Sequence, residues 1–117
     1  MIKKRVLIVE DDEDLRFIIL MNLEELHLEF TVAHSGNKAI ELLNNGLEVD
    51  LIISDYSMPD GDGGMLLDYL LEAGLSIPFI LFTNTLSPYT PPYKRLLGTL
   101  AKFDFDSLEK RIKEILF

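Results

Sequence analysis

Carboxylate, hydroxyl and ammonium side chains follow directly after apolar runs in this sequence. Glu10 and Asp11 come after the first run, Asp55 after a later one, and Thr83 and Lys102 after two more. A short apolar run between turn residues is typical of a strand that is buried on both faces. Ligands of open parallel sheets gather at the carboxyl ends of the strands. We therefore treat these five side chains as candidate parts of one site.

The chemistry that these groups can perform together is phosphoryl transfer. Three carboxylates repel one another, so a cluster of them holds a proton or binds a cation. Hard oxygen ligands suit Mg²⁺, which binds them at about 2.1 Å in octahedral geometry. Lys102 and Thr83 can reach phosphoryl oxygens with an ammonium and a hydroxyl group. Asp55 can act as a nucleophile toward phosphorus, and the transfer needs mainly positioning and charge neutralisation.

The elements that must position these groups alternate between strand and helix patterns. Alternation at this spacing predicts an α/β fold with a parallel sheet, right-handed crossovers and helices on both faces. The first predicted helix comes after the acidic cluster and extends to Leu26. The second has Ser35 as its cap, and the third covers Met65–Ala73. A last helix is predicted with Asp106 or Ser107 as its cap. The predicted strands are Arg5–Val9, Glu29–Ala33, a run ending in Asp55, Phe79–Thr83 and Thr99–Lys102.

The segment between the last two strands breaks this alternation. Asn84–Tyr93 contains three prolines and little periodicity. Each proline in a helix interior costs about 3 kcal/mol because it removes a donor and clashes with the preceding turn. We expect at most one short helical turn here, over Tyr93–Leu97.

Length and composition bound the class of protein. The 117 residues are expected to form one domain, 1–117, and 48% of them are hydrophobic, which supports a packed core. The net charge of −9 argues against direct partners that are nucleic acids or anionic membranes. The chain has no cysteine, and the apolar run Val6–Val9 is too short for a signal peptide. The longest uncharged stretch holds four prolines, so we expect a soluble, cytoplasmic protein without a membrane span.

In this order and at these spacings, the residues resemble the response-regulator receiver domain of two-component signalling. The resemblance covers nearly the whole chain and implies a flavodoxin-like, doubly wound sheet of five strands in the order 2-1-3-4-5. The residues that carry it are Val9-Glu10-Asp11-Asp12, Asp55 with Met58-Pro59, Asp62-Gly63, Thr83 and Lys102.

The resemblance also implies a role for each site residue. Asp55 would accept a phosphoryl group from the phosphohistidine of a sensor histidine kinase or a phosphotransfer protein, so the chain would be a signalling phosphoacceptor rather than an enzyme. Asp11 and Asp55 would bind Mg²⁺ directly, with Glu10 acting through water and the backbone carbonyl of Ser57 as a further ligand. Thr83 and Lys102 would contact the phosphoryl group, and output would pass through an unknown downstream protein.

Four features of the second half depart from the family pattern. Phe103 follows Lys102 where receivers usually have a proline, often in a cis peptide, and a cis bond before another residue would cost about 3 kcal/mol. Thr99 stands where an aromatic side chain usually reports phosphorylation, and Asn84 stands where a small residue is usual. The segment between Thr83 and Lys102 is short and rich in proline, so the fourth helix is expected to be short, reshaped or missing.

These departures spare the predicted chemistry and change the predicted readout. We expect the usual receiver dimer face to be lost, which leaves the oligomeric state open. The loop Thr85–Lys94 becomes the candidate two-state element, and its aromatic and proline content would also suit a contact with a partner.

Other functions remain open at this level. A pseudo-receiver, acting as an interaction module without phosphorylation, would share the same pattern. A phosphatase with an aspartyl nucleophile is less favoured, because Ser57 stands where a second aspartate would be required. The stretch Asp60–Gly64 resembles the start of a calcium-binding loop, but Gly64 and Leu71 occupy acidic positions of that motif.

Overall fold

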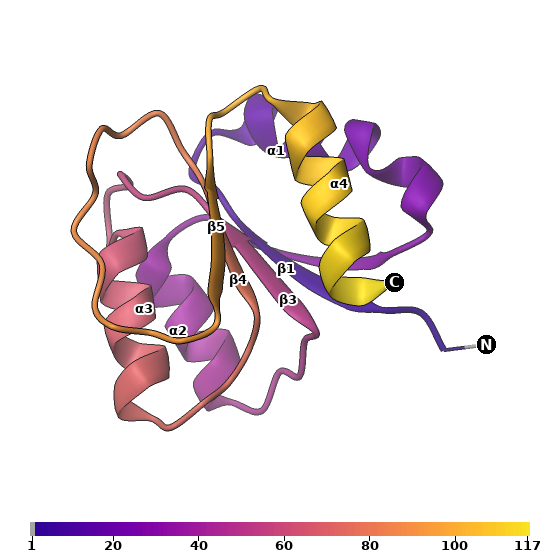
Figure 1. Cartoon of the computed structure of the whole chain (residues 1–117). Helices are drawn as coiled ribbons and strands as arrows, with labels where there is room; N and C mark the ends of the chain where they lie inside the picture. Colours follow the sequence, from indigo (N-terminus) through magenta and orange to yellow (C-terminus); the bar gives the residue numbers. More distant parts are fainter. Residues whose placement is uncertain (1) are drawn as a thin grey trace.

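The computed structural model describes residues 2–117 and contains a central sheet with helices on both sides (Figure 1). The elements alternate along the chain in the predicted way. The strands are β1 (Arg5–Val9), β2 (Glu29–Ala33), β3 (Leu51–Ser54), β4 (Phe79–Phe82) and β5 (Leu96–Leu100). The helices are α1 (Glu13–Asn22), α2 (Gly36–Asn44), α3 (Gly63–Glu72) and α4 (Phe105–Leu116), with a short 3₁₀ helix η1 (Glu24–Leu26).

All pairs of neighbouring strands are parallel, in the order β2-β1-β3-β4-β5. This order confirms the predicted doubly wound, flavodoxin-like fold. Because the strands are parallel, their carboxyl ends meet at one edge of the sheet, and the chain order reverses beside β1 and β3. Asp55 therefore lies next to the residues that follow β1.

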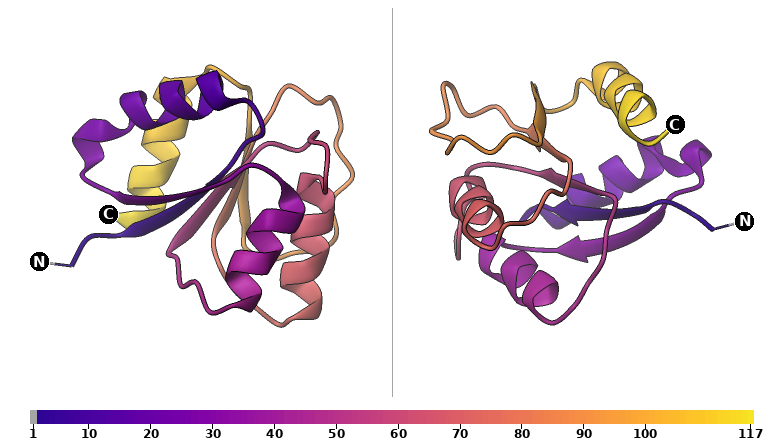
Figure 2. Two further views of the ribbon diagram at one scale, coloured as in Figure 1. Left: turned by 180° about the vertical axis from the view of Figure 1, so that it is seen from behind. Right: turned by 60° about the horizontal axis from the view of Figure 1, so that its bottom comes forward.

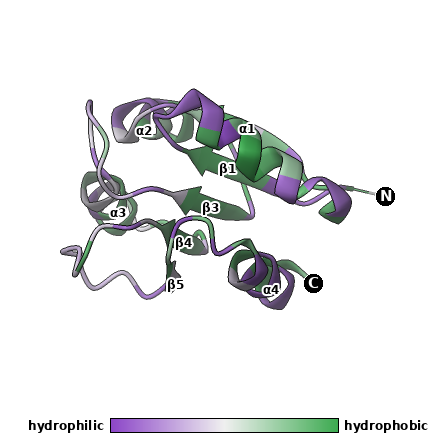
Figure 3. Cartoon of the chain, turned by 90° about the horizontal axis from the view of Figure 1, so that it is seen from above, coloured by the Kyte–Doolittle hydropathy of each residue, from purple (hydrophilic) through white to green (hydrophobic). Residues whose placement is uncertain are grey.

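Two pairs of helices cover the sheet, with α1 and α4 on one face and α2 and α3 on the other (Figure 2). The strands form the most apolar layer of the molecule (Figure 3). Every residue of β3 and β4 is buried, as expected for central strands of a parallel sheet. Each fully buried leucine or isoleucine there contributes about 1.5–3 kcal/mol of hydrophobic stabilisation. The acidic surface therefore surrounds an ordinary apolar core.

Aspartate or serine side chains begin each α-helix by accepting a backbone hydrogen bond. Asp12 accepts from Leu15, and Ser35 from Lys38, at 3.1 and 3.0 Å. The prediction that Asp106 or Ser107 caps the last helix is wrong: Asp104 accepts from the amide of Ser107, so α4 begins at Phe105. The predicted start of α3 at residue 65 was two residues late, because Asp62 is its cap, and the helical pattern before Leu26 divides into α1 and η1.

The chain between β4 and β5 contains no helix, which confirms that the fourth helix of the family pattern is missing. Residues 84–95, here called the proline-rich loop, instead run beside α3 from the carboxyl edge of the sheet to its amino edge (Figure 1, in orange). Two phenols hold the loop to the body of the molecule. The Tyr56 hydroxyl donates to the Tyr89 carbonyl, and the Tyr93 hydroxyl donates to the Ile77 carbonyl, each at 2.7 Å.

The prediction for β5 was displaced along the chain. The strand covers Leu96–Leu100, not 99–102. Of the helical turn that was expected at most over 93–97, a single hydrogen-bonded turn remains, in which the Leu96 amide donates to the Tyr93 carbonyl, because residues 96 and 97 belong to the strand. The amide of Phe79 donates to the carbonyl of Arg95, so pairing with β4 begins as soon as the proline-rich loop ends. On the other side β5 is the edge of the sheet, where Arg111 of α4 donates a hydrogen bond to the Leu97 carbonyl.

Among residues 2–117, no helix combines the length and the apolar character that crossing a membrane requires.

Candidate functional site

Asp55 occupies a buried position directly after β3, with 5% of its surface exposed. Its amide donates to the Val9 carbonyl at 3.0 Å, which continues the pairing of β3 with β1. A Cβ atom at Gly63 would lie 2.7 Å from the Asp55 carbonyl oxygen, so only glycine lets α3 begin this close. The amide of Tyr56 donates to Asp55 Oδ1 at 2.6 Å, which orients the carboxylate.

Three carboxylates converge at this edge of the sheet. Glu10, Asp11 and Asp55 each offer an oxygen atom within 4.8 Å of the others. Glu10 is 2% exposed and accepts the amide of Asp12 at 3.1 Å, whereas Asp11 is exposed to solvent. The predicted acidic cluster is therefore partly buried and open on the Asp11 side.

Lys102 provides the positive charge of the cluster. Its Nζ atom lies 2.6 Å from Asp55 Oδ2 and 3.3 Å from Glu10 Oε1. Burial opposes the charged form of this lysine, but the hydrogen bond to Asp55 and the charges of Glu10 and Asp55 outweigh that effect. The pKa of Lys102 is therefore raised above its usual value. The ammonium group stays protonated at neutral pH and is held between two carboxylates.

Burial has the larger effect on Glu10 and raises its pKa to about 7. The hydrogen bond from Asp12 and the charge of Lys102 act in the opposite direction, and the charge of Asp55 reinforces the rise. At neutral pH, Glu10 of the folded chain is therefore about half protonated, whereas an exposed glutamate would be ionised.

The donor set fits a divalent cation. When ionised, the three carboxylates and one ammonium carry a net charge of −2, which an ion such as Mg²⁺ would balance. Ser57 follows on the loop after β3, and its hydroxyl lies 2.8 Å from that of Thr85. The assignment of its carbonyl as a ligand stays a prediction.

Thr83 lies at the end of β4 and is 5% exposed. Its hydroxyl donates to Thr85 Oγ1 at 3.2 Å, and the amide of Thr85 donates back to Thr83 Oγ1 at the same distance. Asn84 accepts the backbone amide of Lys102 at 3.1 Å. The start of the proline-rich loop is therefore hydrogen-bonded to both residues that were predicted to contact a phosphoryl group.

Arg16 belongs to this site, although no motif in the sequence indicated it. Its Nη1 atom donates to the backbone carbonyls of Glu10 and Asp11, at 2.8 and 3.2 Å. The available signal was a long donor side chain in the first turn of the helix that follows the acidic pair. Such a side chain can fold back over the loop and fix its backbone.

The turn after Lys102 has an unusual backbone conformation. No cis peptide bond occurs in residues 2–117, and Phe103 instead adopts a left-handed conformation with φ of 70°. A bulky residue rarely adopts this conformation, which costs roughly 1–2 kcal/mol. Phe103 thus forms a left-handed turn directly beside the lysine, without a cis peptide bond.

A doubly wound parallel sheet with an acidic cluster and a lysine at its carboxyl edge defines a flavodoxin-like α/β protein with a polar site at the switch point. The sequence model of the response regulator receiver domain matches residues 6–92. The chain belongs to this family. Receiver domains are signalling modules of two-component systems; they interact with histidine kinases or phosphotransfer proteins and bind Mg²⁺ at an acidic pocket.

Curated relatives and solved structures agree with this assignment. The chain is 31% identical over 93 residues to the response regulator SaeR of Staphylococcus aureus, which covers 80% of this chain and 40% of that protein. It is 32% identical over 87 residues to a probable transcriptional regulatory protein of Picosynechococcus, covering 69% and 35%. The chain thus spans about two fifths or less of the length of these relatives.

Two solved structures of response regulators align with almost the whole chain. The response regulator TrrA of Thermotoga maritima, in complex with Mg²⁺ and BeF, has a TM-score of 0.81 at 26% identity, covering 97% of this chain and 99% of that one. The receiver domain of the Francisella response regulator 1452 has a TM-score of 0.82 at 28% identity, covering 97% and 96%.

Proposed function

We propose that residues 1–117 act as a receiver domain that accepts a phosphoryl group on Asp55 in the presence of Mg²⁺. The observation that carries this proposal is the position of Lys102, 2.6 Å from Asp55 and within the same cluster as Glu10 and Asp11. A carboxylate, an ammonium group and a cation-binding pair are the parts that phosphoryl transfer to an aspartate requires.

The chemical step forms one bond and breaks one. A carboxylate oxygen of Asp55 attacks the phosphorus atom of a phosphohistidine on a kinase or phosphotransfer protein, and a P–O bond forms. The P–N bond breaks, and its electron pair returns to the imidazole nitrogen, which then takes up a proton from solvent. Lys102 moves from the carboxylate to a phosphoryl oxygen, where its charge offsets the charge that is gained.

The remaining site residues hold the cation and the phosphoryl group. Asp11 and Asp55 would bind Mg²⁺ directly, Glu10 would act through water, and Ser57 would contribute its carbonyl. When bound, Mg²⁺ neutralises phosphoryl oxygens and orients them for in-line transfer. Thr83 donates its hydroxyl hydrogen to a third phosphoryl oxygen.

The readout of phosphorylation passes through the proline-rich loop. In the structure the Thr83 hydroxyl hydrogen is directed at Thr85, so binding of a phosphoryl oxygen breaks that hydrogen bond. Thr99 is exposed and offers no ring that could move instead. The loop is thus the element whose equilibrium the phosphoryl group can shift, and a downstream protein reads its conformation.

A small acyl phosphate donor tests the proposal directly. The full chain is incubated with the donor and Mg²⁺, and intact mass spectrometry detects the added phosphate. Asp55→Asn should lose the adduct, while Asp106→Asn, a matched change at an exposed position of α4, should keep it. If the Asp55→Asn chain carries as much added phosphate as the unaltered chain, or if the unaltered chain carries none, phosphorylation at this site is refuted.

The missing helix and the absence of a ring at Thr99 favour one second candidate, a pseudo-receiver that binds its partner without phosphorylation. This alternative predicts no mass adduct, and an amide spectrum of the proline-rich loop that does not change with donor and Mg²⁺. A shift of the Thr85 and Tyr89 amides with the donor excludes it.

A further inference from the structure

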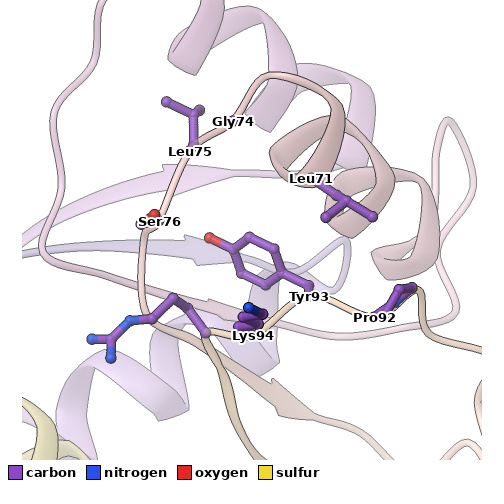
Figure 4. Close-up of a pocket in the computed structure, with 8 residues that line it drawn as sticks. Leu71, Gly74, Leu75, Ser76, Pro92, Tyr93 and Lys94 are labelled. Carbon is purple, nitrogen blue, oxygen red and sulfur yellow. The ribbon is translucent and has the colours of Figure 1, made fainter.

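A pocket of about 220 Å³ lies between the end of α3 and the end of the proline-rich loop (Figure 4). Its walls are the apolar side chains of Leu71 and Leu75 on one side and the ring of Tyr93 on the other. The residues that complete the rim include Pro92, Lys94 and Arg95.

This pocket is separate from the Asp55 site. Its residues precede β4 and β5 in the chain, whereas Asp55, Thr83 and Lys102 follow the ends of their strands. In a parallel sheet these two groups lie at opposite edges. The pocket exists because the proline-rich loop replaces a helix and places an aromatic ring beside α3.

The walls of the pocket are held in place before any partner binds. Tyr93 is 7% exposed, and its hydroxyl is fixed at 2.7 Å from the Ile77 carbonyl. Pro91 is buried, and two consecutive prolines restrict the backbone before the ring. Leu71 is 42% exposed, so its contact surface is open to solvent. A rigid, partly apolar pocket costs little conformational entropy on binding.

The volume limits the occupant to a small group. Pockets for drug-sized ligands span roughly 300–1,000 Å³, so this one accommodates little more than a single leucine or phenylalanine side chain. Interfaces between proteins often depend on one such apolar anchor in a preformed pocket. The size therefore favours a side chain of a partner protein over a cofactor.

Two cations determine the charge that the occupant must carry. Lys94 and Arg95 are exposed, and neither forms an ion pair within residues 2–117. Arg95 lines the pocket together with Tyr93. Burial raises the pKa of the Tyr93 phenol, and the positive charge of Arg95 acts against this rise. On a chain with a net charge of −9, this adjacent basic pair is a local exception that attracts anionic groups.

The carboxyl end of α3 makes the electrostatic potential different on the two sides of the pocket. This end of the helix lies on the Gly74 side of the pocket, where the negative end of the helix dipole disfavours a carboxylate. The side of Lys94 and Arg95 is therefore the favoured place for an anion, and the apolar anchor then lies between Leu71 and Tyr93.

We propose that this pocket docks an acidic peptide segment of a partner protein, with a leucine or phenylalanine anchor between Leu71 and Tyr93 and a neighbouring carboxylate on Lys94 and Arg95. The proposal goes beyond phosphorylation of Asp55 and does not depend on it.

Two blocked tripeptides, glutamyl-phenylalanyl-glutamate and lysyl-phenylalanyl-lysine, test the proposal by titration of the ¹⁵N-labelled full chain. The acidic peptide should shift the amides of Leu71, Tyr93 and Lys94, with an affinity on the order of millimolar. The basic peptide should bind about tenfold more weakly, since its charges meet two cations.

Variants distinguish the apolar anchor from the charge. Lys94→Gln combined with Arg95→Gln should weaken the acidic peptide about fivefold, since exposed ion pairs contribute modestly. Leu71→Ser should weaken it comparably, whereas Lys110→Gln on the distant face should leave it unchanged. Absence of any shift, equal binding of the two peptides, or shifts confined to another surface would overturn the proposal.

Discussion

The buried carboxyl group of Glu10 should make the stability of the metal-free chain fall as the pH rises. Its pKa is 4.5 in an unfolded chain and about 7 in the folded one, because burial disfavours the charge. The folded state therefore binds a proton more tightly than the unfolded state. This contribution to stability is complete below pH 4.5 and is lost as the pH rises through 7.

The magnitude follows from the difference between the two pKa values. At about 1.4 kcal/mol per pKa unit, Glu10 contributes roughly 3 kcal/mol across this range. Mg²⁺ should reverse the trend, because the cation stabilises the ionised carboxylates and competes with the proton. Stabilisation by Mg²⁺ should then be small below pH 4.5 and largest above pH 7.

Urea denaturation across this pH range, with a chelator or with Mg²⁺, measures both effects. Glu10→Gln cannot ionise and should flatten the profile in the chelator, while Glu48→Gln, a matched change at an exposed position, should leave it intact. If the unaltered chain and Glu10→Gln give parallel profiles without metal, the proton on Glu10 is not held by the fold and the reasoning fails.

Three further substitutions test other parts of the structure. Arg16→Gln should weaken Mg²⁺ binding about tenfold, because the backbone carbonyls of Glu10 and Asp11 lose their donor. Arg5→Gln removes the same charge and should leave Mg²⁺ binding unchanged. Equal losses of affinity in a Mg²⁺ titration would show that only net charge matters. Phe103→Gly should leave stability unchanged or raise it by up to about 1 kcal/mol, because φ at this position is positive. Phe103→Pro should lower stability by more than about 1 kcal/mol, because proline cannot adopt a positive φ. Urea midpoints in the opposite order would contradict the left-handed turn. Tyr93→Phe should cost about 1 kcal/mol in the same assay through the lost hydrogen bond to a backbone carbonyl, and an unchanged midpoint would show that the phenol is not anchored.

Strongly patterned elements were predictable from the sequence alone. β1 and β2 have the predicted bounds because each is a short apolar or β-branched run between charged or turn residues. The loss of the helix after Thr83 was predictable because three prolines remove donors that a helix needs. The meeting of Asp55 with Glu10 and Asp11 followed from the rule that parallel strand ends share an edge.

Features that depend on tertiary contacts were not predictable in the same way. β5 is only half-buried and contains Gly98, so its start is determined by pairing with β4 rather than by its own pattern. The guanidinium contacts of Arg16 and the hydroxyl contacts of Thr83 depend on side-chain directions that no sequence period reports. The left-handed turn at Phe103 opposes local preference, and only its surroundings maintain it.

The contact between Arg111 and the Leu97 carbonyl lies at the edge strand β5, where two copies of this chain could pair through their backbones. An exposed edge strand presents free carbonyl and amide groups on which another chain can add a strand. Gly98 has no side chain to obstruct such an approach, but the guanidinium of Arg111 lies against it and occupies the neighbouring carbonyl. One arginine therefore protects the edge from intermolecular strand addition, and its loss would expose the chain to aggregation.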